Sequence, residues 1–355
     1  MSQALLAELT TFGLGGPAGR LVTATDRGGI VAAVRAADAS GEPLLIVGGG
    51  SNLLVSDDGV PGTVLRFASR GLALGEEAGG YRLVAVEAGH PWDETVRETL
   101  AAGLSGLEAL SGIPGLAGAT PVQNVGAYGA DVSQSLVGVE VFDRVRDRVL
   151  TLSNAELAFG YRDSLIKRSI DHGSPRYVVL AVTFRLAVRE EGPVAYGQLA
   201  SALGVELGAV VPSACIREAV LALRASKGMV YDAGDADTHS AGSFFTNPLV
   251  AASVAAGMPD DAPRFPAAGG LVKLSAAWLI EHAGFAKGYG LPGTPGEAVS
   301  GGRASLSTKH TLALTNRGSA SAADVVALAR HVRDGVVAAW GVELHAEPLF
   351  IGCTL

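Results

Sequence analysis

Residues 112–129 read GIPGLAGATPVQNVGAYG, and this stretch is the most informative part of the chain. It contains five glycines, two prolines and no charged residue, so it cannot form a regular helix or a central strand. Its apolar side chains, among them Ile113, Leu116 and Tyr128, distinguish it from a solvated linker. A glycine-rich turn lets backbone N–H groups approach a ligand without an intervening Cβ. The stretch therefore predicts contact with a flat or anionic ligand such as a flavin or a nucleotide diphosphate.

The length and bulk composition indicate a folded protein of two or three domains. The 355 residues are 48% hydrophobic, and the formal net charge is −8, which disfavours a nucleic-acid-binding surface and agrees with ordinary solubility. The apolar runs are far shorter than the ~20 residues of a spanning helix, and the N-terminus lacks a basic leader. Cys215 and Cys353 form no disulfide framework, so we expect a cytoplasmic protein without membrane contact.

The first region has the pattern of a small α/β unit. Strands are expected over 20–25 and 43–47, with a helix over 28–39 between them, and a further strand over 62–67. The second expected strand continues directly into Gly48-Gly49-Gly50-Ser51-Asn52-Leu53-Leu54. Strand, helix, strand and glycine loop in this order are typical of a small α/β unit.

The second region has the pattern of an antiparallel sheet. Apolar, β-branched stretches at 81–87, 137–142, 148–152 and 177–186 are separated by turn-like charged segments. One helix is expected over 92–102, ending at a glycine. Several strands with few helices between them predict a mainly antiparallel arrangement.

The third region is expected to contain three helices. Ser213 is a candidate N-cap for a helix through 225, and a second helix is expected over 271–282. Ser321 and Asp324 have the spacing of a capping box, and an apolar stripe follows up to a glycine. The glycine-rich segment 285–304 is interpreted as a surface loop.

The triple-glycine loop is a candidate phosphate site. Gly48 to Asn52 follow a strand, where main-chain N–H groups and the Ser51 hydroxyl could bind a pyrophosphate. The Rossmann pattern G-x-G-x-x-G is absent. A plain tight turn is the alternative interpretation of this loop.

Two isolated charged residues are candidates for substrate chemistry. Arg162, in Tyr-Arg-Asp-Ser, could bind a substrate carboxylate with both arms of its guanidinium, or could pair with Asp163 on the surface. Glu347 lies in an otherwise apolar C-terminal segment, where a carboxylate is costly to bury unless it is paired. It is therefore either functional or a salt-bridge partner.

Ser243 is a candidate proton donor. It lies between a glycine and the aromatic pair Phe244 and Phe245, with Asn247 available to orient it. The pattern G-x-S-x-G is absent, which argues against a hydrolase nucleophile. The alternative is a strand end whose two phenylalanines belong to the core.

Other polar residues carry weaker signals. Lys309 and His310, which follow Ser305 and Ser307, could contact phosphates. The seven histidines show neither H-E-x-x-H nor a clustered spacing, so no metal site is expected.

Taken together and in this order, these segments resemble the UDP-N-acetylenolpyruvoylglucosamine reductase (MurB) family, with features of its type I subgroup. The segments that carry the resemblance extend over almost the whole chain: Leu9–Gly16, Gly48–Leu54, Ser111–Gly129, Tyr161–Ser164, Ala241–Pro248 and Glu347–Gly352.

The resemblance implies an α+β fold, with an FAD-binding fold of the vanillyl-alcohol oxidase group and an α+β substrate-binding domain. The implied segments are FAD-binding subdomain 1 at 1–67, FAD-binding subdomain 2 at 68–190, a substrate-binding domain at 191–328, and a C-terminal helix and strand at 329–355 that return to the FAD region.

The resemblance also implies residue roles. Arg162, Ser243 and Glu347 match the catalytic trio. Tyr196 is similar to a mobile-loop tyrosine that closes on the UDP moiety, and Lys227 and Asn247 match substrate-pocket positions, to which we add Lys309 and His310 as substrate contacts. The expected FAD-binding residues are Gly48, Gly49, Gly50, Ser51, Asn52, Leu53, Gly112, Gly115, Gly118, Ala119, Thr120, Gln123, Asn124, Gly126, Ala127 and Tyr128.

The implied activity is NADPH-dependent reduction of a UDP-sugar enolpyruvyl ether in peptidoglycan precursor synthesis, with hydride from FAD N5 and a proton from Ser243. The expected partner is this small molecule alone, and the expected state is a monomer. The chain departs from the family pattern near the catalytic glutamate, where Ala346 precedes it and Pro348 and Leu349 follow. Lys227 is followed by Gly228-Met229 rather than Leu-Pro.

Two alternative functions stay open from the sequence. One is another FAD oxidase or dehydrogenase of the same fold, acting on a sugar lactone or a hydroxy acid. The other is a non-catalytic UDP-sugar binding protein that has kept the fold without flavin.

Overall fold

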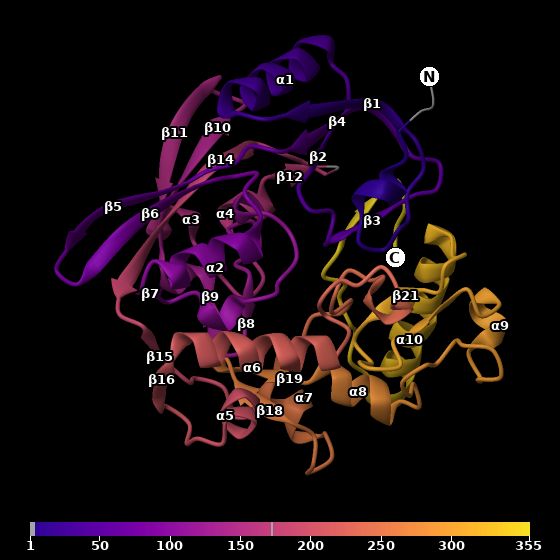
Figure 1. The fold of residues 1–355 in the computed structure, drawn as a ribbon. Helices are drawn as coiled ribbons and strands as arrows, with labels where there is room; N and C mark the ends of the chain where they lie inside the picture. Colours follow the sequence, from indigo (N-terminus) through magenta and orange to yellow (C-terminus); the bar gives the residue numbers. More distant parts are fainter. Residues whose placement is uncertain (1–3, 172) are drawn as a thin grey trace. The chain divides into compact units, whose positions relative to one another are not determined.

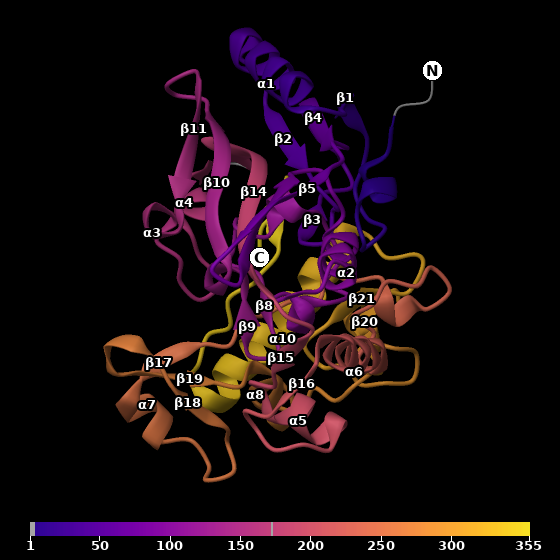
Figure 2. The same cartoon turned by 60° about the vertical axis from the view of Figure 1, so that its left-hand side comes forward.

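The computed structural model describes residues 4–171 and 173–355. Contacts divide the chain into two compact units, and neither is one continuous segment. The larger unit contains Ala18–Gly50 and Val60–Val230, and the smaller contains the chain up to Pro17 together with Ser51–Gly59 and Tyr231–Leu355. Figures 1 and 2 label the elements of both units.

The elements of the larger unit are β1 (Ala18–Ala24), α1 (Arg27–Ser40), β2 (Leu44–Val47), β4 (Val60–Phe67), β5 (Leu72–Ala78), β6 (Tyr81–Glu87), α2 (Trp92–Ala101), β7 (Leu104–Ser105), η2 (Glu108–Leu110), η3 (Ala117–Ala119), β8 (Gly126–Ala127), β9 (Ala130–Asp131), η4 (Val132–Gln134), β10 (Leu136–Asp143), β11 (Arg148–Ser153), α3 (Asn154–Leu157), α4 (Leu165–Arg168), β12 (Ile170–Asp171), β13 (Ser174–Pro175), β14 (Tyr177–Val188), β15 (Glu191–Pro193), α5 (Gly197–Leu203), β16 (Val210–Pro212) and α6 (Ser213–Ser226).

The elements of the smaller unit are η1 (Leu6–Leu9), β3 (Leu53–Val55), η5 (Ala236–Thr238), β17 (Leu249–Ala251), α7 (Ala252–Ala256), β18 (Arg264–Pro266), η6 (Ala268–Gly270), β19 (Leu271–Leu274), α8 (Ala276–His282), α9 (Glu297–Ser300), β20 (Ala304–Leu306), β21 (Leu314–Asn316), α10 (Ala322–Trp340) and β22 (Leu349–Ile351).

The N-terminal α/β element of the larger unit has the expected order of strand, helix and strand. Its three strands are parallel, in the order β1-β4-β2, and α1 lies along them (Figure 1). The helix begins after Asp26, whose carboxylate accepts the Gly29 N–H at 2.8 Å, and the left-handed Gly41 ends it. Ile30 and Val34 bury one helical face, so this expected unit is confirmed.

The expected antiparallel sheet is also confirmed. Its strands run in the order β11-β10-β14-β6-β5, with β7 pairing the end of β14, and β10, β11 and β14 lie together in Figure 2. Val84 lies opposite Phe184 on the buried face, and both are fully buried. Trp92, the first residue of α2, packs against Phe184 with ring centroids 5.7 Å apart. The strand faces and α2 therefore share one core.

The core of the smaller unit forms around α10. Val325, Leu328, Val332 and Val336 are fully buried on this helix. Ser321 and Asp324 form the expected capping box, and Gly341 ends the helix in the left-handed conformation. In the same unit β22 pairs in parallel with β3, so the C-terminal strand adjoins the segment that follows the triple-glycine loop.

Three expectations about the third region need correction. The segment 271–282 is not one helix, because its first four residues form β19, which pairs with β17 and β18; the helix begins after Ser275, whose side chain accepts the Trp278 N–H. Ser213 is the first residue of α6, and Pro212 occupies the N-cap. The segment 285–304 is not all surface loop, since it contains α9 and the buried Phe285.

Asp324 provides a pH-dependent contribution to the stability of the smaller unit. Hydrogen bonds from Arg303, with further ones from Ser321, lower the pKa of Asp324 from 3.8 to about 2. Since the folded pKa lies below the unfolded one, the contribution is complete above pH 3.8 and is lost as pH falls through about 2.

We expect Asp324→Asn to lower the free energy of unfolding by about 2 kcal/mol near neutral pH. Urea denaturation followed by the fluorescence of Trp278 and Trp340, both in this unit, measures the difference. The difference between variant and wild type should shrink as the pH is lowered through the acidic range. A difference that is independent of pH would contradict the assignment to this carboxylate.

No helix among the described residues is both long and apolar enough to cross a membrane.

Candidate functional site

The two glycine-rich loops of the larger unit lie in direct backbone contact. A Cβ on Gly49 would be 2.5 Å from the Gly115 Cα, a distance that real Cβ atoms essentially never show. A Cβ on Gly118 would likewise lie 2.5 Å from the Ala88 Cβ. Glycine is therefore required at 49 for the two loops to approach each other, and at 118 for the second loop to approach the segment before α2. The structure thus brings together the segments 48–50 and 112–129 that the sequence singled out.

The loop at 112–129 is held by the segment before α2. The Trp92 N–H donates to the Gly115 carbonyl at 3.0 Å, the Ala117 N–H to the His90 carbonyl at 2.8 Å, and the Gly118 N–H to the Ala88 carbonyl at 2.9 Å. These three main-chain hydrogen bonds hold residues 115–118 in place, although the segment has no regular secondary structure over most of its length.

Left-handed backbone geometry is concentrated among the predicted site residues. The described chain has positive φ at five non-glycine residues, and three of them are Asn124 (48°), Tyr128 (49°) and Arg162 (54°). Such conformations cost free energy and persist where the surroundings hold them. The left-handed conformation of Asn124 is held by its own side-chain amide. The Asn124 Nδ2 donates to the Gly160 carbonyl at 3.2 Å, and its Oδ1 accepts the Ser133 N–H at 3.1 Å.

Arg162 is tied to the second glycine loop. Its Nη2 donates to the Gly126 carbonyl at 3.0 Å, and its guanidinium lies 5.7 Å from the centre of the Tyr161 ring. The alternative partner Asp163 forms an ion pair with Arg168. The Lys167 Nζ donates to the Arg162 carbonyl at 2.8 Å, which helps to hold the left-handed main chain.

The predicted substrate residues Tyr196 and Lys227 meet at Tyr128. The Tyr196 ring lies edge-on to the Tyr128 ring, with centroids 5.8 Å apart. The Lys227 Nζ lies 5.8 Å from the Tyr128 ring centre and donates to Gln198 at 2.7 Å. Burial raises the pKa of Tyr128, so the phenol stays neutral and available as a hydrogen-bond donor.

Arg224 also belongs to this cluster, and the sequence did not single it out. Its Nη2 donates to the Met229 carbonyl at 2.8 Å, and burial lowers its pKa. Its Nε would lie 3.4 Å from a Cβ on Gly112. This partly buried guanidinium, beside the start of the glycine loop, places positive charge next to Tyr128.

In the smaller unit, main-chain bonds bring the Ser243 and Glu347 segments side by side. The Glu347 N–H donates to the Phe244 carbonyl at 2.8 Å, and the Thr246 N–H donates to the His345 carbonyl at 2.9 Å. Phe244 and Phe245 are fully buried, as the alternative interpretation held, while Ser243 is only partly buried. The phenylalanines therefore anchor the segment that carries the hydroxyl.

Residues after the triple glycine join the Glu347 segment. The Asn52 Nδ2 donates to the Glu347 carbonyl at 3.4 Å, and the Leu349 N–H donates to the Asn52 carbonyl at 3.0 Å. The structure thus places Ser51–Leu53 and the predicted catalytic glutamate in the same part of the smaller unit.

The other predicted substrate contacts have structural partners in the smaller unit. The Asn247 Oδ1 accepts the Ala276 N–H at 2.9 Å, at the start of α8. The Lys309 Nζ lies 2.5 Å from an Asp235 carboxylate oxygen, and this hydrogen bond raises the pKa of Lys309. The His310 N–H donates to the Ser307 hydroxyl at 3.2 Å.

Each unit therefore gathers part of the predicted site. The larger unit holds Arg162 against the loop that carries Gly126, and the smaller unit pairs the Ser243 and Glu347 segments. The convergence of all three catalytic side chains stays a prediction.

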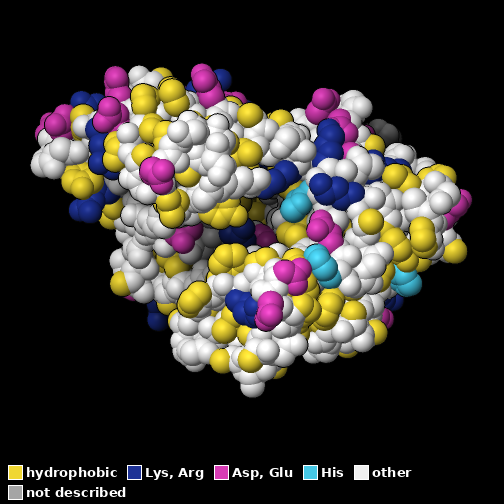
Figure 3. Space-filling model, turned by 90° about the horizontal axis from the view of Figure 1, so that it is seen from below, with side chains coloured by type: hydrophobic (Ala, Val, Ile, Leu, Met, Phe, Trp, Pro, Cys, Tyr) yellow, Lys and Arg dark blue, Asp and Glu magenta, His cyan; other side chains and the backbone are white. Residues whose placement is uncertain are grey.

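The surface drawn in Figure 3 mixes acidic and basic side chains with hydrophobic and uncharged ones. On that face of the described residues the basic side chains form no continuous band.

Two protein-family models match the chain. The model described as "FAD binding domain" covers residues 18–153. The model described as "UDP-N-acetylenolpyruvoylglucosamine reductase, C-terminal domain" covers residues 234–351.

Curated relatives match over nearly the whole chain. The UDP-N-acetylenolpyruvoylglucosamine reductase of Thermobifida fusca (strain YX) is 50% identical over 361 residues, which cover 99% of this chain and 97% of the relative. The protein of the same name from Saccharopolyspora erythraea is 52% identical over 363 residues, covering 99% of this chain and 95% of the relative.

The chain belongs to the UDP-N-acetylenolpyruvoylglucosamine reductase family. A solved structure agrees: the UDP-N-acetylenolpyruvylglucosamine reductase (MurB) of Thermus caldophilus aligns with a TM-score of 0.64 at 28% identity, covering 99% of this chain and 98% of that one. Membership in the reductase family confirms the resemblance, the α+β FAD-binding fold, the class of flavin-dependent oxidoreductase, FAD as a cofactor, and a place in peptidoglycan precursor synthesis.

Proposed function

We propose that this chain reduces the enolpyruvyl ether of UDP-N-acetylglucosamine to UDP-N-acetylmuramate, with NADPH as the reductant and FAD as the carrier. The observation that carries the proposal is the full-length match, at 50–52% identity over 99% of the chain, to reductases of that name.

Two features of the glycine loops in the larger unit support an FAD site there. Gly49 and Gly115 bring two loops into contact where no side chain could fit, and the left-handed Asn124 and Tyr128 turn main-chain groups in the same segment. The predicted FAD-binding residues of both loops would hold the cofactor. A bound FAD would supply the hydride chemistry between NADPH and the methylene carbon of the substrate.

We assign Arg162 to the substrate carboxylate. Negative charge grows on this group as hydride adds to the neighbouring double bond, and a preorganised cation stabilises that charge most strongly in a water-poor site. The bond from its Nη2 to the Gly126 carbonyl supports this role, because it holds one arm of the fork in place.

We assign Ser243 as the donor of the proton. Its Oγ–H would pass the proton to the carbon next to the carboxylate, while the hydride adds to the methylene carbon, so that both new C–H bonds are accounted for. Serine is a weak acid, but an enolate-like carbon is a strong base, and the transfer is feasible at a fixed short distance. Glu347 would act near the same carboxylate, in a protonated or hydrogen-bonded form.

Substrate binding is assigned to five residues. Tyr196 and Lys227 would contact the UDP moiety from the cluster at Tyr128, with Tyr196 45% exposed and thus available to a ligand. Asn247, Lys309 and His310 complete the proposed contacts.

The remaining assignments concern organisation and location. We propose that 1–67 and 68–190 bind FAD, that 191–328 binds substrate, and that 329–355 returns to the FAD region. A monomer in a reducing cytoplasm fits the two free cysteines, Cys215 and Cys353.

A colour experiment tests the function. The purified protein should be yellow, should bleach when NADPH is added without oxygen, and should regain its colour when the enolpyruvyl UDP-sugar follows. Reoxidation by oxygen coupled to oxidation of a sugar lactone or hydroxy acid would instead support the oxidase alternative. A colourless protein that releases no flavin on denaturation would support the non-catalytic alternative.

A further inference from the structure

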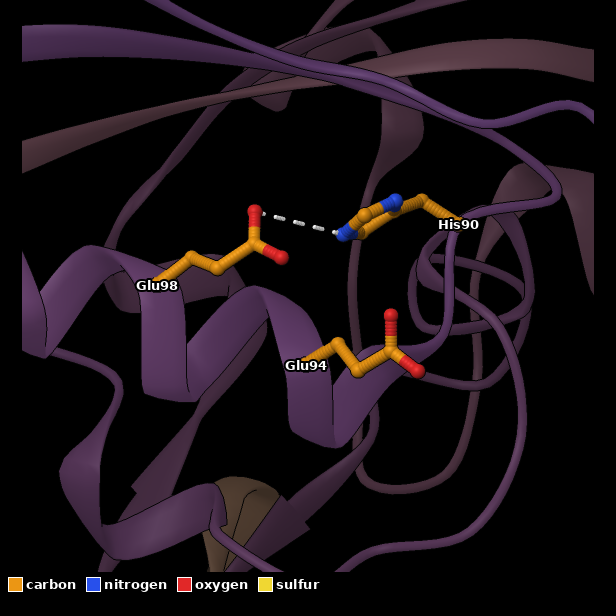
Figure 4. Close-up of side chains that lie close together, drawn as sticks. All are labelled: His90, Glu94 and Glu98. Carbon is orange, nitrogen blue, oxygen red and sulfur yellow. Dashed lines mark ion pairs between the residues drawn. The ribbon is translucent and has the colours of Figure 1, made fainter.

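A histidine and two glutamates of the larger unit converge outside the predicted catalytic site. His90 lies in the segment before α2, and Glu94 and Glu98 lie one turn apart on that helix (Figure 4). One potential ligand atom from each, an imidazole nitrogen or a carboxylate oxygen, lies within 4.8 Å of the other two. Side chains four residues apart share one face of a helix, which is why both carboxylates point toward the imidazole.

The imidazole is buried and faces the carboxylates without a hydrogen bond. His90 is only 6% exposed, and its Nε2 is inaccessible to solvent and has no hydrogen-bond partner among the described residues. Its nearest carboxylate contact, the Glu98 Oε2, is 3.6 Å away, which is too long for a hydrogen bond. A buried polar atom without a hydrogen-bond partner costs free energy unless a ligand or a water molecule binds to it.

We propose that His90, Glu94 and Glu98 bind a divalent transition-metal ion of the zinc class. Zinc binds imidazole nitrogen at about 2.0–2.1 Å and carboxylate oxygen at about 2.0–2.2 Å, so two ligands of a tetrahedral ion lie about 3.4 Å apart. The 3.6 Å between the His90 Nε2 and the Glu98 Oε2 is close to that separation. One imidazole and two carboxylates match the ligand types of such ions, and a water molecule would complete the tetrahedron.

Metal binding would break two existing contacts, and both of them are weak. The Glu94 Oε2 pairs with the Arg70 Nη1 at 2.7 Å, but the two side chains are 40% and 59% exposed, and exposed pairs contribute about 0–1 kcal/mol. Metal at Nε2 places the ring proton on Nδ1, which removes the hydrogen bond that the Gly71 N–H donates to this atom. That bond is 3.5 Å long, at the outer limit for hydrogen bonding.

The ion would reinforce the part of the molecule that supports the glycine loop. The His90 carbonyl accepts the Ala117 N–H of that loop, while Glu94 and Glu98 belong to α2. An ion bound by all three would therefore connect α2 to the main chain that holds residues 115–118. This role is independent of the catalytic chemistry.

Zinc titration of the FAD-loaded protein tests the proposal. Isothermal calorimetry with zinc chloride should show saturable binding of one ion, and the ion should raise the melting temperature. Loss of a second-shell partner typically weakens metal binding about 10- to 100-fold, so loss of a direct ligand in His90→Gln or Glu98→Gln should weaken it by at least as much. Magnesium, which prefers six oxygen ligands, should bind far more weakly.

His282→Gln is the matched control. The His282 Nε2 lies 3.9 Å from an Asp261 carboxylate oxygen, but both side chains are exposed and belong to the smaller unit. This variant should bind zinc as the wild type does. The proposal is overturned if the wild type takes up no zinc, if His90→Gln and Glu98→Gln retain wild-type affinity, or if His282→Gln loses it. Glu98 is 40% exposed, so Glu98→Gln should fold and decide the matter even if His90→Gln does not.

Discussion

Replacing Ser243 with alanine should slow reoxidation of the reduced flavin by the UDP-sugar substrate roughly 10²- to 10⁴-fold, the usual contribution of a positioned acid. Reduction of the flavin by NADPH should keep its rate, because no proton from this hydroxyl enters that half-reaction. The fold should be preserved, since Phe244 and Phe245 rather than Ser243 fill the core at this point.

Stopped-flow absorbance at the flavin band measures the two half-reactions separately. Ser253→Ala is a suitable control, because Ser253 is an exposed serine of α7 in the same unit, and both of its rates should match the wild type. If Ser243→Ala slows both half-reactions equally, or neither, then Ser243 is not the proton donor.

Local signals predicted those elements whose formation depends on nearby residues. The helix α10 was predictable because its cap at Ser321, its apolar stripe and its terminating Gly341 all lie within the element. The segment 271–282 was mistaken for one helix because β19 is defined by its partners β17 and β18, and a single sequence does not show them. Where pairing with a distant strand decides the structure, periodicity alone is insufficient.

The candidate site also combines features that the local sequence predicts with features that only the folded chain brings together. Gly49 and Gly115 could be singled out because only glycine lets a backbone come so close to another group. Their contact with each other depends on the tertiary fold, which the local sequence does not show. The pairing of the Ser243 and Glu347 segments rests on main-chain bonds between residues far apart in sequence. The family resemblance predicted that Ser243 and Glu347 act in one site. The pattern of either segment alone could not predict this.

Two features were missed for identifiable reasons. Arg224 has the pattern of an ordinary residue of an amphipathic helix, and only its place against Gly112 of the glycine loop marks it as unusual. The cluster at His90 contains a single histidine, so it matches neither H-E-x-x-H nor a clustered histidine spacing. The signal that could have found it is a histidine followed four and eight residues later by glutamates, with the helix starting between the histidine and the first glutamate.

Replacing Arg162 with lysine should lower the rate of substrate reduction nearly as much as replacing it with alanine. Loss of one preorganised donor to a developing anion typically costs about 10²–10³ in rate. Lysine keeps the charge but presents it as a point, whereas the planar guanidinium can hold a carboxylate with two parallel bonds.

The structure adds a second reason why lysine should fail. One arm of the Arg162 fork donates to the Gly126 carbonyl at 3.0 Å, which anchors the guanidinium on the loop, and a planar guanidinium carries further N–H donors that an ammonium does not have in the same geometry. The single ammonium of a lysine could not bind the Gly126 carbonyl and the substrate carboxylate in the same way at the same time. The left-handed main chain at Arg162, with φ of 54°, further limits how the shorter head group can be repositioned.

Arg168→Lys provides the matched control for this prediction. Arg168 lies close by in sequence and pairs with Asp163, with its side chain 45% exposed, and a lysine there should leave the rate of substrate reduction unchanged. Single-turnover reoxidation of the reduced enzyme measures the chemical step for Arg162→Lys, Arg162→Ala and the control. A wild-type rate in Arg162→Lys would show that charge alone suffices, and the two-armed recognition of the carboxylate by Arg162 would have to be abandoned.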